Sequence, residues 1–311
     1  MLTTWLTEEF GLSVPVLGAP MGGRAGGRLA GEVGRAGGLG MLGAARYTTP
    51  DWIAEEAEIA RRAGGRVGVG LMTWSLHDDD SLLDAAIAAK PELISLSFGD
   101  PAPFIGRVKE AGIPVCSQVN SLADLREVEA AGVDFVIAQG TEAGGHTGRI
   151  ATLPLLQQIL EATDLPVVAA GGIATGRGLA AVLAAGAEGA LIGTALLASP
   201  ETTGPDYAPG KLVSADSADT VYTSVFDRAR EQPWPSRWRA RALVNDYTRR
   251  WHGHDAGIAT SRLIDDYDRE DPERGVVYAG QAAGLVRSQS PAAEVVERIG
   301  AQAAELLGRL R

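Results

Sequence analysis

The chain has 311 residues, of which 45% are apolar, so it can bury a large core in one large domain or two smaller ones. Its 39 acidic residues outnumber the 28 basic ones, for a formal net charge of −11, and the absence of a basic block argues against a nucleic-acid partner. The single cysteine, Cys116, excludes an intramolecular disulfide framework and any multi-cysteine metal or iron–sulfur site.

A membrane span needs roughly 18–20 consecutive apolar residues, and no run in this sequence reaches that length. The first ten residues lack the basic and apolar segments of a secretory signal peptide. We therefore expect a cytoplasmic protein without a membrane partner.

Short, unbroken apolar runs alternate with helical patterns through the first two thirds of the chain. Unbroken runs are typical of strands covered on both faces, and strand–helix alternation predicts a parallel sheet. We expect strands at residues 14–19, 38–42, 67–72, 93–98, 113–119, 133–138, 166–170 and 189–192. Eight such units in about 195 residues fit a closed (β/α)8 TIM barrel better than an open doubly wound sheet, although counting alone does not prove closure.

Helix starts can be read from capping residues. Thr49 can cap a helix, Pro50 fits its first position, and Asp51 favours its positive end. Residues 121–124 resemble a capping box in which Asp124 replaces the usual Glu.

The character of the sequence changes at Ser199. Several Pro and Gly residues between 200 and 210 indicate a connector, and helical patterns follow at 258–268 and 291–310. We predict a barrel over residues 1–198 and a helical extension over residues 199–311, packed on the barrel as a lid or an interface. The tryptophans of the extension are expected to serve packing rather than binding; they are Trp234, Trp238 and Trp251.

A glycine-dense loop, residues 139–149, follows the sixth predicted strand and carries His146. Glycine loses more backbone freedom on folding than any other residue, so such density makes sense where backbone approaches a ligand. A histidine suits proton transfer because its unperturbed pKa lies near neutral pH. A tight turn with a surface histidine explains the loop alone equally well.

Glycines also end the last two predicted strands, at Gly171-Gly172-Ile173 and at Gly193-Thr194. Each pair precedes a helix, and helix N-termini with accessible amides bind phosphate. In TIM barrels, the loops after strands seven and eight often form such a site. The sequence therefore predicts a phosphate-binding pair of loops.

Other chemistries lack their residues. A Schiff-base aldolase is disfavoured, because the lysines lie away from the strand ends; they are Lys90, Lys109 and Lys211. A nucleotide dehydrogenase with a cysteine nucleophile is disfavoured as well, because Cys116 falls within a predicted strand and not on a loop at a strand end. The histidine and carboxylate clusters at 77–80 and 252–254 look like solvated loops, so no metal site is expected. A phosphate-bearing cofactor that supplies the reactivity remains, and flavin mononucleotide (FMN) fits.

Four motifs together resemble the nitronate monooxygenase family, formerly called 2-nitropropane dioxygenase. They are Ala19-Pro20-Met21, the residue 139–148 loop with Glu-Ala-Gly-Gly-His, the residue 169–174 segment, and Gly186-Ala187 with Ile192-Gly193-Thr194. The likeness covers roughly residues 12–200. It implies an FMN-containing TIM barrel that oxidises nitronates with O2 to a carbonyl compound and nitrite.

The resemblance also implies roles for individual residues. His146 would be catalytic, either as a base on a nitroalkane or as a partner that orients a bound nitronate. The remaining matched positions would bind FMN: Ala19, Pro20 and Met21 at the flavin ring, Gln139, Gly144 and Gly145 along the flavin and ribityl side, and Gly171, Gly172, Gly193 and Thr194 at the phosphate.

One position departs from the family pattern, because Gly70 stands where many members carry an Asn. The histidine loop also occurs in flavin-dependent enoyl-acyl-carrier-protein reductases, and similar barrels serve as NAD(P)H:quinone reductases. The alternatives are therefore an NAD(P)H-dependent flavin oxidoreductase, a flavin-binding protein without efficient turnover, or another phosphate-ligand barrel. Whether the chain forms a homo-oligomer stays open, because an apolar interface and an apolar core look alike in one sequence.

Overall fold

Eight parallel strands form the centre of the computed structural model, which describes residues 2–254 and 258–309. Nearly all of their residues are buried, as expected for strands covered on both faces. The strands are β1 (Val16–Gly18), β2 (Gly40–Ala44), β3 (Val67–Met72), β4 (Leu93–Ser97), β5 (Val115–Val119), β6 (Phe135–Gln139), β8 (Val167–Ala170) and β9 (Gly189–Ile192). Each lies within two residues of a strand predicted from the sequence.

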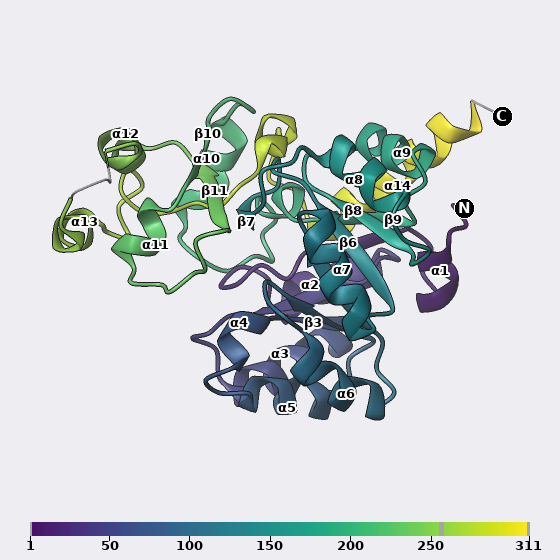
Figure 1. Ribbon diagram of the computed structural model, residues 1–311. Helices are drawn as coiled ribbons and strands as arrows, with labels where there is room; N and C mark the ends of the chain where they lie inside the picture. Colours follow the sequence, from purple (N-terminus) through teal and green to yellow (C-terminus); the bar gives the residue numbers. More distant parts are fainter. Residues whose placement is uncertain (1, 255–257, 310–311) are drawn as a thin grey trace.

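The sheet closes on itself. Its order is β1-β9-β8-β6-β5-β4-β3-β2, and β1 returns to β2 through a parallel bridge between Leu17 and Leu39. The Gly18 N–H donates to the Leu39 carbonyl at 2.8 Å, and the Leu39 N–H donates to the Val16 carbonyl at 2.9 Å. The predicted TIM barrel is therefore confirmed (Figure 1).

Helices between the strands form the outer ring. They are α2 (Gly27–Arg35), α3 (Pro50–Arg62), α4 (Thr73–Leu76), α5 (Ser81–Ala88), α6 (Ala102–Glu110), α7 (Leu122–Ala131), α8 (Thr152–Leu160) and α9 (Gly176–Ala184). Thr49 caps α3 as predicted, and Ser121 caps α7 by accepting from the Asp124 N–H at 3.2 Å. The Asp124 carboxylate accepts from the Asn120 N–H instead of completing a capping box.

The amino-terminal end of the barrel is filled by apolar side chains. Helix α1 (Trp5–Phe10) lies across it, and the rings of Trp5 and Phe10 pack on Phe135 of β6 with centroids 5.4 and 6.1 Å apart. Cys116 is buried in the same cluster. A ligand site in the barrel must therefore lie at the carboxyl ends of the strands.

The outer ring is completed late in the chain by α14 (Ala292–Gly308). This helix packs between α9 and α2, and its Val296 and Ile299 are fully buried in the main core (Figure 1). Our division after residue 198 assigned this helix to the extension, whereas the structure places it in the barrel wall. The predicted helix end, Leu310, lies outside the described residues.

The segment between β9 and α14 makes up the extension and lies over one side of the barrel (Figure 1). Its elements are η1 (Thr194–Leu196), α10 (Tyr207–Ser214), β10 (Thr220–Thr223), α11 (Val225–Ala229), β11 (Arg239–Leu243), α12 (Asp246–Trp251), α13 (Thr260–Asp266) and η2 (Gln281–Leu285).

The extension is not purely helical, which corrects the sequence prediction. Strands β10 and β11 pair antiparallel, and β11 also pairs with β7 (Gly145–Thr147), which belongs to the histidine loop. All three strands have five residues or fewer, and β7 lies in the glycine-rich loop. Neither a long apolar run nor an alternation of apolar and polar residues therefore predicts them from the sequence. The pairing with β7 joins the extension to the barrel.

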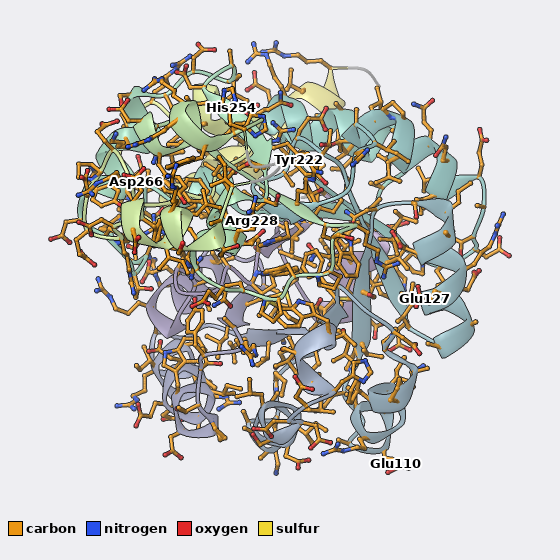
Figure 2. The ribbon with its side chains drawn as sticks, turned by 60° about the vertical axis from the view of Figure 1, so that its left-hand side comes forward. Glu110, Glu127, Tyr222, Arg228, His254 and Asp266 are labelled. Atoms are coloured by element: carbon orange, nitrogen blue, oxygen red, sulfur yellow. The ribbon has the colours of Figure 1, made fainter. Side chains whose placement is uncertain are left out.

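Two apolar clusters stabilise the extension. One surrounds Leu212 and Ala279, and the other contains Phe226, Tyr247 and Trp251, which agrees with the packing role expected of Trp251. In the turned view of Figure 2, His254 and Asp266 lie on the extension, away from Glu110 and Glu127 on the barrel helices. None of the described helices is long and apolar enough to cross a membrane.

Candidate active site

A cavity of about 410 Å³ opens at the carboxyl ends of the barrel strands, between the barrel and the extension. The structure brings every site residue predicted from the sequence to its wall. These residues are Ala19, Pro20, Met21, Gln139, Gly144, Gly145, His146, Gly171, Gly172, Gly193 and Thr194.

The segment after β1 contacts the neighbouring strands β9 and β3. The Ala19 N–H donates to the Ile192 carbonyl at 2.9 Å, and a Cβ added at Gly70 would collide with the ring of Pro20. Gly70 therefore gives Pro20 the space that a larger residue would take. This contact supplies a packing reason for glycine at position 70.

The two glycine-rich strand ends present backbone donors to the cavity. Gly171 and Gly172 adopt φ values of 101° and 76°, in the left-handed region that favours glycine. Within the described residues, the amide N–H groups of Gly171, Gly172, Gly193 and Thr194 donate to no protein acceptor. An anion with several acceptor oxygens would satisfy these donors, and the nearby N-terminus of α9 favours negative charge.

Gln139 is oriented by a chain of side-chain hydrogen bonds. The Trp238 indole donates to the Asn120 oxygen at 3.0 Å, and the Asn120 amide donates to the Gln139 side-chain oxygen at 3.0 Å. All three side chains are buried. Because the side-chain oxygen of Gln139 accepts the hydrogen bond from Asn120, the NH2 group of Gln139 can donate to a ligand in the cavity.

The histidine loop is fastened from both sides. Glu142 accepts from the Thr152 N–H at 2.6 Å at the start of α8, and its carbonyl accepts from the Gln281 N–H at 2.9 Å. On the extension, Arg241 donates from Nε to the Thr141 carbonyl at 2.7 Å. The carboxylate in the Glu-Ala-Gly-Gly-His motif therefore anchors the loop to α8.

Asp227 of α11 is the hydrogen-bond partner of His146. The imidazole Nε2 lies 3.0 Å and 3.1 Å from the two carboxylate oxygens of Asp227. His146 is 8% exposed and Asp227 is 5% exposed, so water competes little for this contact. Residues 81 positions apart in the sequence thus form a buried acid–base pair.

Tyr278 and Trp234 complete the surroundings of this pair. The Tyr278 hydroxyl donates to Asp227 at 3.3 Å, and burial, followed by the Asp227 charge, holds the pKa of Tyr278 well above its ordinary value. Tyr278 therefore stays a hydrogen-bond donor. The indole of Trp234 stacks on the imidazole of His146, with centroids 3.4 Å apart and planes inclined by 8°.

The contact with Asp227 selects one form of the neutral imidazole. A carboxylate accepts hydrogen bonds, so Nε2 carries the proton and Nδ1 is left as the proton acceptor. In the described part of the chain, Nδ1 has no protein partner, and it is not among the fully buried atoms that lack one. Because His146 lines the cavity, Nδ1 is placed to take a proton from a ligand there.

The described wall of the cavity contains no Cys, Lys, Asp or Glu side chain, and His146 is its only histidine. Burial raises the pKa of the Cys116 thiol to about 12, so this thiol is a core group and no nucleophile. Among residues 2–254 and 258–309, no group of three or more His, Cys, Asp and Glu side chains is arranged to hold a metal ion.

Sequence reasoning missed Asp227, Trp234 and Tyr278. Asp227 lies in a segment without a recognisable motif, and the sequence pattern around Trp234 predicts a side chain that serves packing and not the site. Only the folding of the extension over the barrel brings these residues to His146, so no local pattern could have identified them.

Residues 65–302 match the family described as nitronate monooxygenase. The chain belongs to this family. A curated relative from Rhodococcus jostii, "(3aS,4S,5R,7aS)-5-hydroxy-7a-methyl-1-oxo-octahydro-1H-indene-4-carboxyl-CoA dehydrogenase", is 36% identical over 73% of this chain. The matched region spans 64% of that relative's length. The resemblance inferred from the motifs is thus confirmed at the level of the family.

Solved structures of the fold cover almost the whole chain. FabK from Thermotoga maritima is 31% identical, with a TM-score of 0.86 over 100% of this chain and 99% of that one. Nitroalkane oxidase from Streptomyces ansochromogenes is 34% identical, with a TM-score of 0.82 over 98% of this chain and 99% of that one. Both similarities extend through the extension that carries Asp227.

Proposed function

We propose that the protein is an FMN-dependent enzyme that oxidises alkyl nitronates with O2 to a carbonyl compound and nitrite. The observation that carries the proposal is His146, held through Nε2 by a buried carboxylate, with Nδ1 free at a cavity whose strand ends offer unpaired amides. Family membership and the similarity to a nitroalkane oxidase support it.

The residues around the cavity fit FMN. The amides of Gly171, Gly172, Gly193 and Thr194 would bind its phosphate, because they have no protein acceptor in the described residues. The segment Ala19-Pro20-Met21 would lie against the ring through backbone atoms. Gln139 would offer its NH2 group, and the small residues Gly144 and Gly145 would allow close approach of the ribityl side. When bound, FMN supplies the redox chemistry that no side chain here provides.

His146 would act on the substrate proton. With a neutral nitroalkane, Nδ1 takes the proton from the carbon that bears the nitro group, and the Asp227 carboxylate stabilises the imidazolium that forms. With a preformed nitronate, this proton is already gone, and the imidazole orients the anion. Trp234 covers the imidazole face and excludes water from it.

A second candidate is an NAD(P)H-dependent flavin reductase. The full-length similarity to FabK favours it, as do the arginines that line the cavity, Arg24, Arg230 and Arg269, since a dinucleotide carries phosphates. In this reading, a nicotinamide would stack on the flavin without a separate nucleotide-binding domain.

One experiment separates the two candidates. Flavin-loaded protein is mixed anaerobically with ethyl nitronate and, separately, with NADH, while the absorbance of oxidised flavin is followed. We expect rapid loss of absorbance with the nitronate and only slow change with NADH. Rapid loss with NADH and indifference to the nitronate would reject nitronate oxidation in favour of the reductase.

Replacing the histidine tests its role as a base. His146→Ala should retain flavin and lose about 10²–10⁴-fold in kcat/KM toward neutral nitroethane, the usual contribution of general-base catalysis. Activity toward ethyl nitronate should fall much less, because that substrate needs no deprotonation. Steady-state kinetics on both substrates make the comparison, and equal losses would show that His146 is not primarily a base.

Asp227 is expected to act as a positioning residue. Asp227→Asn should lower kcat toward nitroethane by roughly 10²-fold, because an amide can donate to Nε2 and stabilise the wrong tautomer. Flavin content and kcat toward ethyl nitronate should change little. Asp246→Asn, an exposed aspartate of α12, serves as the matched control. A parallel loss on both substrates would assign Asp227 a purely structural role.

The phosphate site can be tested through flavin retention. Gly193→Val should release flavin, because a Cβ at this position already lies 3.3 Å from the Ala19 Cβ and 3.4 Å from the Met21 sulfur. Gly106→Val is the control, since a Cβ there meets no atom within 4 Å. Absorbance after gel filtration measures the flavin-to-protein ratio. Equal ratios in both variants would show that the phosphate lies elsewhere.

A further inference from the structure

Two aromatic rings form one side of the cavity next to His146. They belong to Phe98, which directly follows β4, and to Trp234, which lies in the loop between α11 and β11. Their centroids are 5.2 Å apart and their planes are inclined by 83°, an edge-to-face pair. Both side chains are only partly buried. We call this pair the aromatic wall. Apolar surface that faces a cavity favours a ligand that covers it.

The aromatic wall is supported from behind by two further tryptophans. The ring of Phe98 packs edge-on against Trp238, with centroids 5.5 Å apart, and the ring of Trp234 packs on Trp74 of α4, with centroids 5.3 Å apart. Trp238 is buried and donates its indole N–H to Asn120 at 3.0 Å. The wall is therefore fixed before a ligand binds, and little conformational freedom is lost on binding.

Backbone strain is concentrated in the segments that carry the aromatic wall. Within the described chain, the non-glycine residues with positive φ are Lys90, Phe98 and Glu231. Phe98 has a φ of 66°, and Glu231, in the loop that carries Trp234, has a φ of 50°. A bulky residue rarely adopts this conformation, and where it does, the surrounding structure holds it, often at a ligand site. Here the Phe98 carbonyl accepts from the Trp74 N–H at 3.2 Å.

The loop of Trp234 is tied to the helix that carries the carboxylate of the acid–base pair. The Gln232 N–H donates to the Asp227 carbonyl at 2.8 Å, and the Trp234 N–H donates to the Gln232 carbonyl at 2.8 Å. Pro233 and Pro235 flank the tryptophan, and a proline fixes its own φ and restricts the residue before it. The indole and the acid–base pair are therefore held at a set distance from each other.

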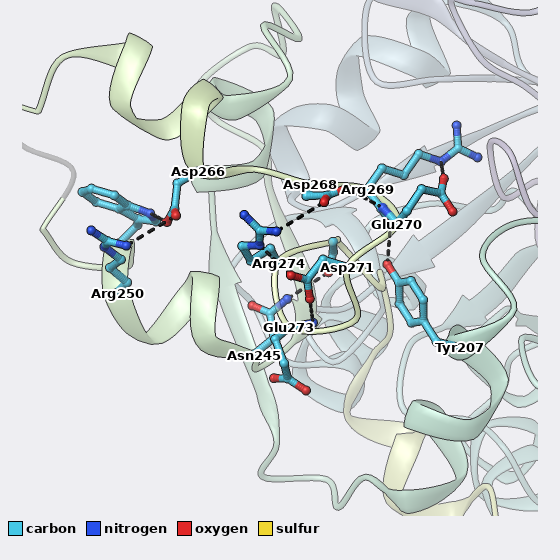
Figure 3. Close-up of polar contacts among 12 residues, drawn as sticks. Tyr207, Asn245, Arg250, Asp266, Asp268, Arg269, Glu270, Asp271, Glu273 and Arg274 are labelled. Carbon is cyan, nitrogen blue, oxygen red and sulfur yellow. Dashed lines mark hydrogen bonds and ion pairs between the residues drawn. The ribbon is translucent and has the colours of Figure 1, made fainter.

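Val276 adds a further apolar side chain to the cavity from a segment that is equally well held. The Asn245 amide donates to the Gly275 carbonyl at 2.8 Å. In the turn that precedes Gly275, Arg274 donates to Asp271 at 2.6 Å (Figure 3). The apolar part of the cavity is thus formed by ordered segments of both the barrel and the extension.

We propose that the protein selects nitronates that carry a flat aryl substituent, and that Phe98 and Trp234 are the residues that determine this specificity. Because the indole of Trp234 lies against the imidazole face of His146, a substrate whose reacting carbon approaches Nδ1 places its substituent at the aromatic wall. The methyl group of ethyl nitronate is too small to cover either ring. The inference rests on the proposed function, since the reaction at the nitronate is the one stated there.

Three preformed nitronates test the selectivity: 2-phenylethyl nitronate, 2-cyclohexylethyl nitronate and ethyl nitronate. All three present the same reacting group and need no deprotonation, so their kcat/KM values compare the substituents. The phenyl compound should exceed ethyl nitronate about 10-fold or more, because its ring buries additional apolar surface. It should exceed the cyclohexyl compound by about 2- to 10-fold, because aromatic pairs gain more than their buried area provides.

Variants assign the selectivity to the aromatic wall. Trp234→Leu and Phe98→Leu should each lower the phenyl-to-cyclohexyl ratio of kcat/KM about 2-fold or more, since each removes one ring. Trp234→Phe should largely keep the ratio, because it keeps a ring in the same loop. Trp52→Leu is the matched control, a partly buried tryptophan of α3 outside the cavity wall. An unchanged ratio in both wall variants would overturn the proposal.

A binding measurement separates the selectivity from the reaction. The unreactive probe 2-phenylacetamide is titrated into flavin-loaded protein while indole fluorescence is followed. It should bind about 10-fold more tightly than acetamide in the wild type, and less tightly in Phe98→Leu. Turnover of ethyl nitronate without any preference for the phenyl compounds would reject the aryl specificity and leave the proposed function standing. Tight binding of 2-phenylacetamide without turnover of any nitronate would reject the proposed reaction and retain an aryl-binding wall.

Discussion

The arrangement of this site depends on the pairing of β7 with β11. His146 lies in a loop so rich in glycine that the loop has little conformational preference of its own. Three residues of that loop pair with a strand of the extension, opposite Arg239 to Arg241, and Arg241 donates to the Thr141 carbonyl. This pairing sets the position of the imidazole, and the same folding event brings Asp227 to its Nε2. Removing the extension would therefore leave the histidine without both its backbone frame and its carboxylate.

The two parts of the chain contribute different chemistry. The barrel offers mainly backbone: unpaired amides at the ends of β8 and β9, and glycines such as Gly70 that let Pro20 lie close to the strands. The extension offers side chains, among them Asp227, Trp234 and Tyr278, around one histidine of the barrel. A cofactor held through backbone needs few specific side chains, whereas proton transfer needs a particular geometry. This difference explains why the barrel motifs are readable in the sequence and the acid–base partners are not.

The charge of the outer surface also differs from that of the cavity wall. The net charge of −11 describes the outer surface, where ion pairs such as Arg107 with Asp84 are exposed to water and contribute little stability. The cavity wall has the opposite character, and its arginines come from the first barrel loop and from the extension. The total charge argues against a nucleic-acid surface, but it does not give the sign of the electrostatic field at the site, because that field depends on a few groups brought together by folding.

The sequence by itself determined the eight barrel strands, the closed barrel as the favoured topology, the position of the histidine loop and the set of glycines at the strand ends. These features depend on local chemistry: unbroken apolar runs mark strands buried on both faces, and glycine marks backbone that bends sharply or approaches a ligand. Only the tertiary structure decided that β7, β10 and β11 form a sheet and that Asp227 accepts a hydrogen bond from His146 Nε2. It also decided that α14, which begins at Ala292, completes the barrel wall, although the sequence predicted that the barrel ends at residue 198. Those contacts join segments far apart in the chain, and their residues carry no local signal because each becomes functional only when its distant partner is in place.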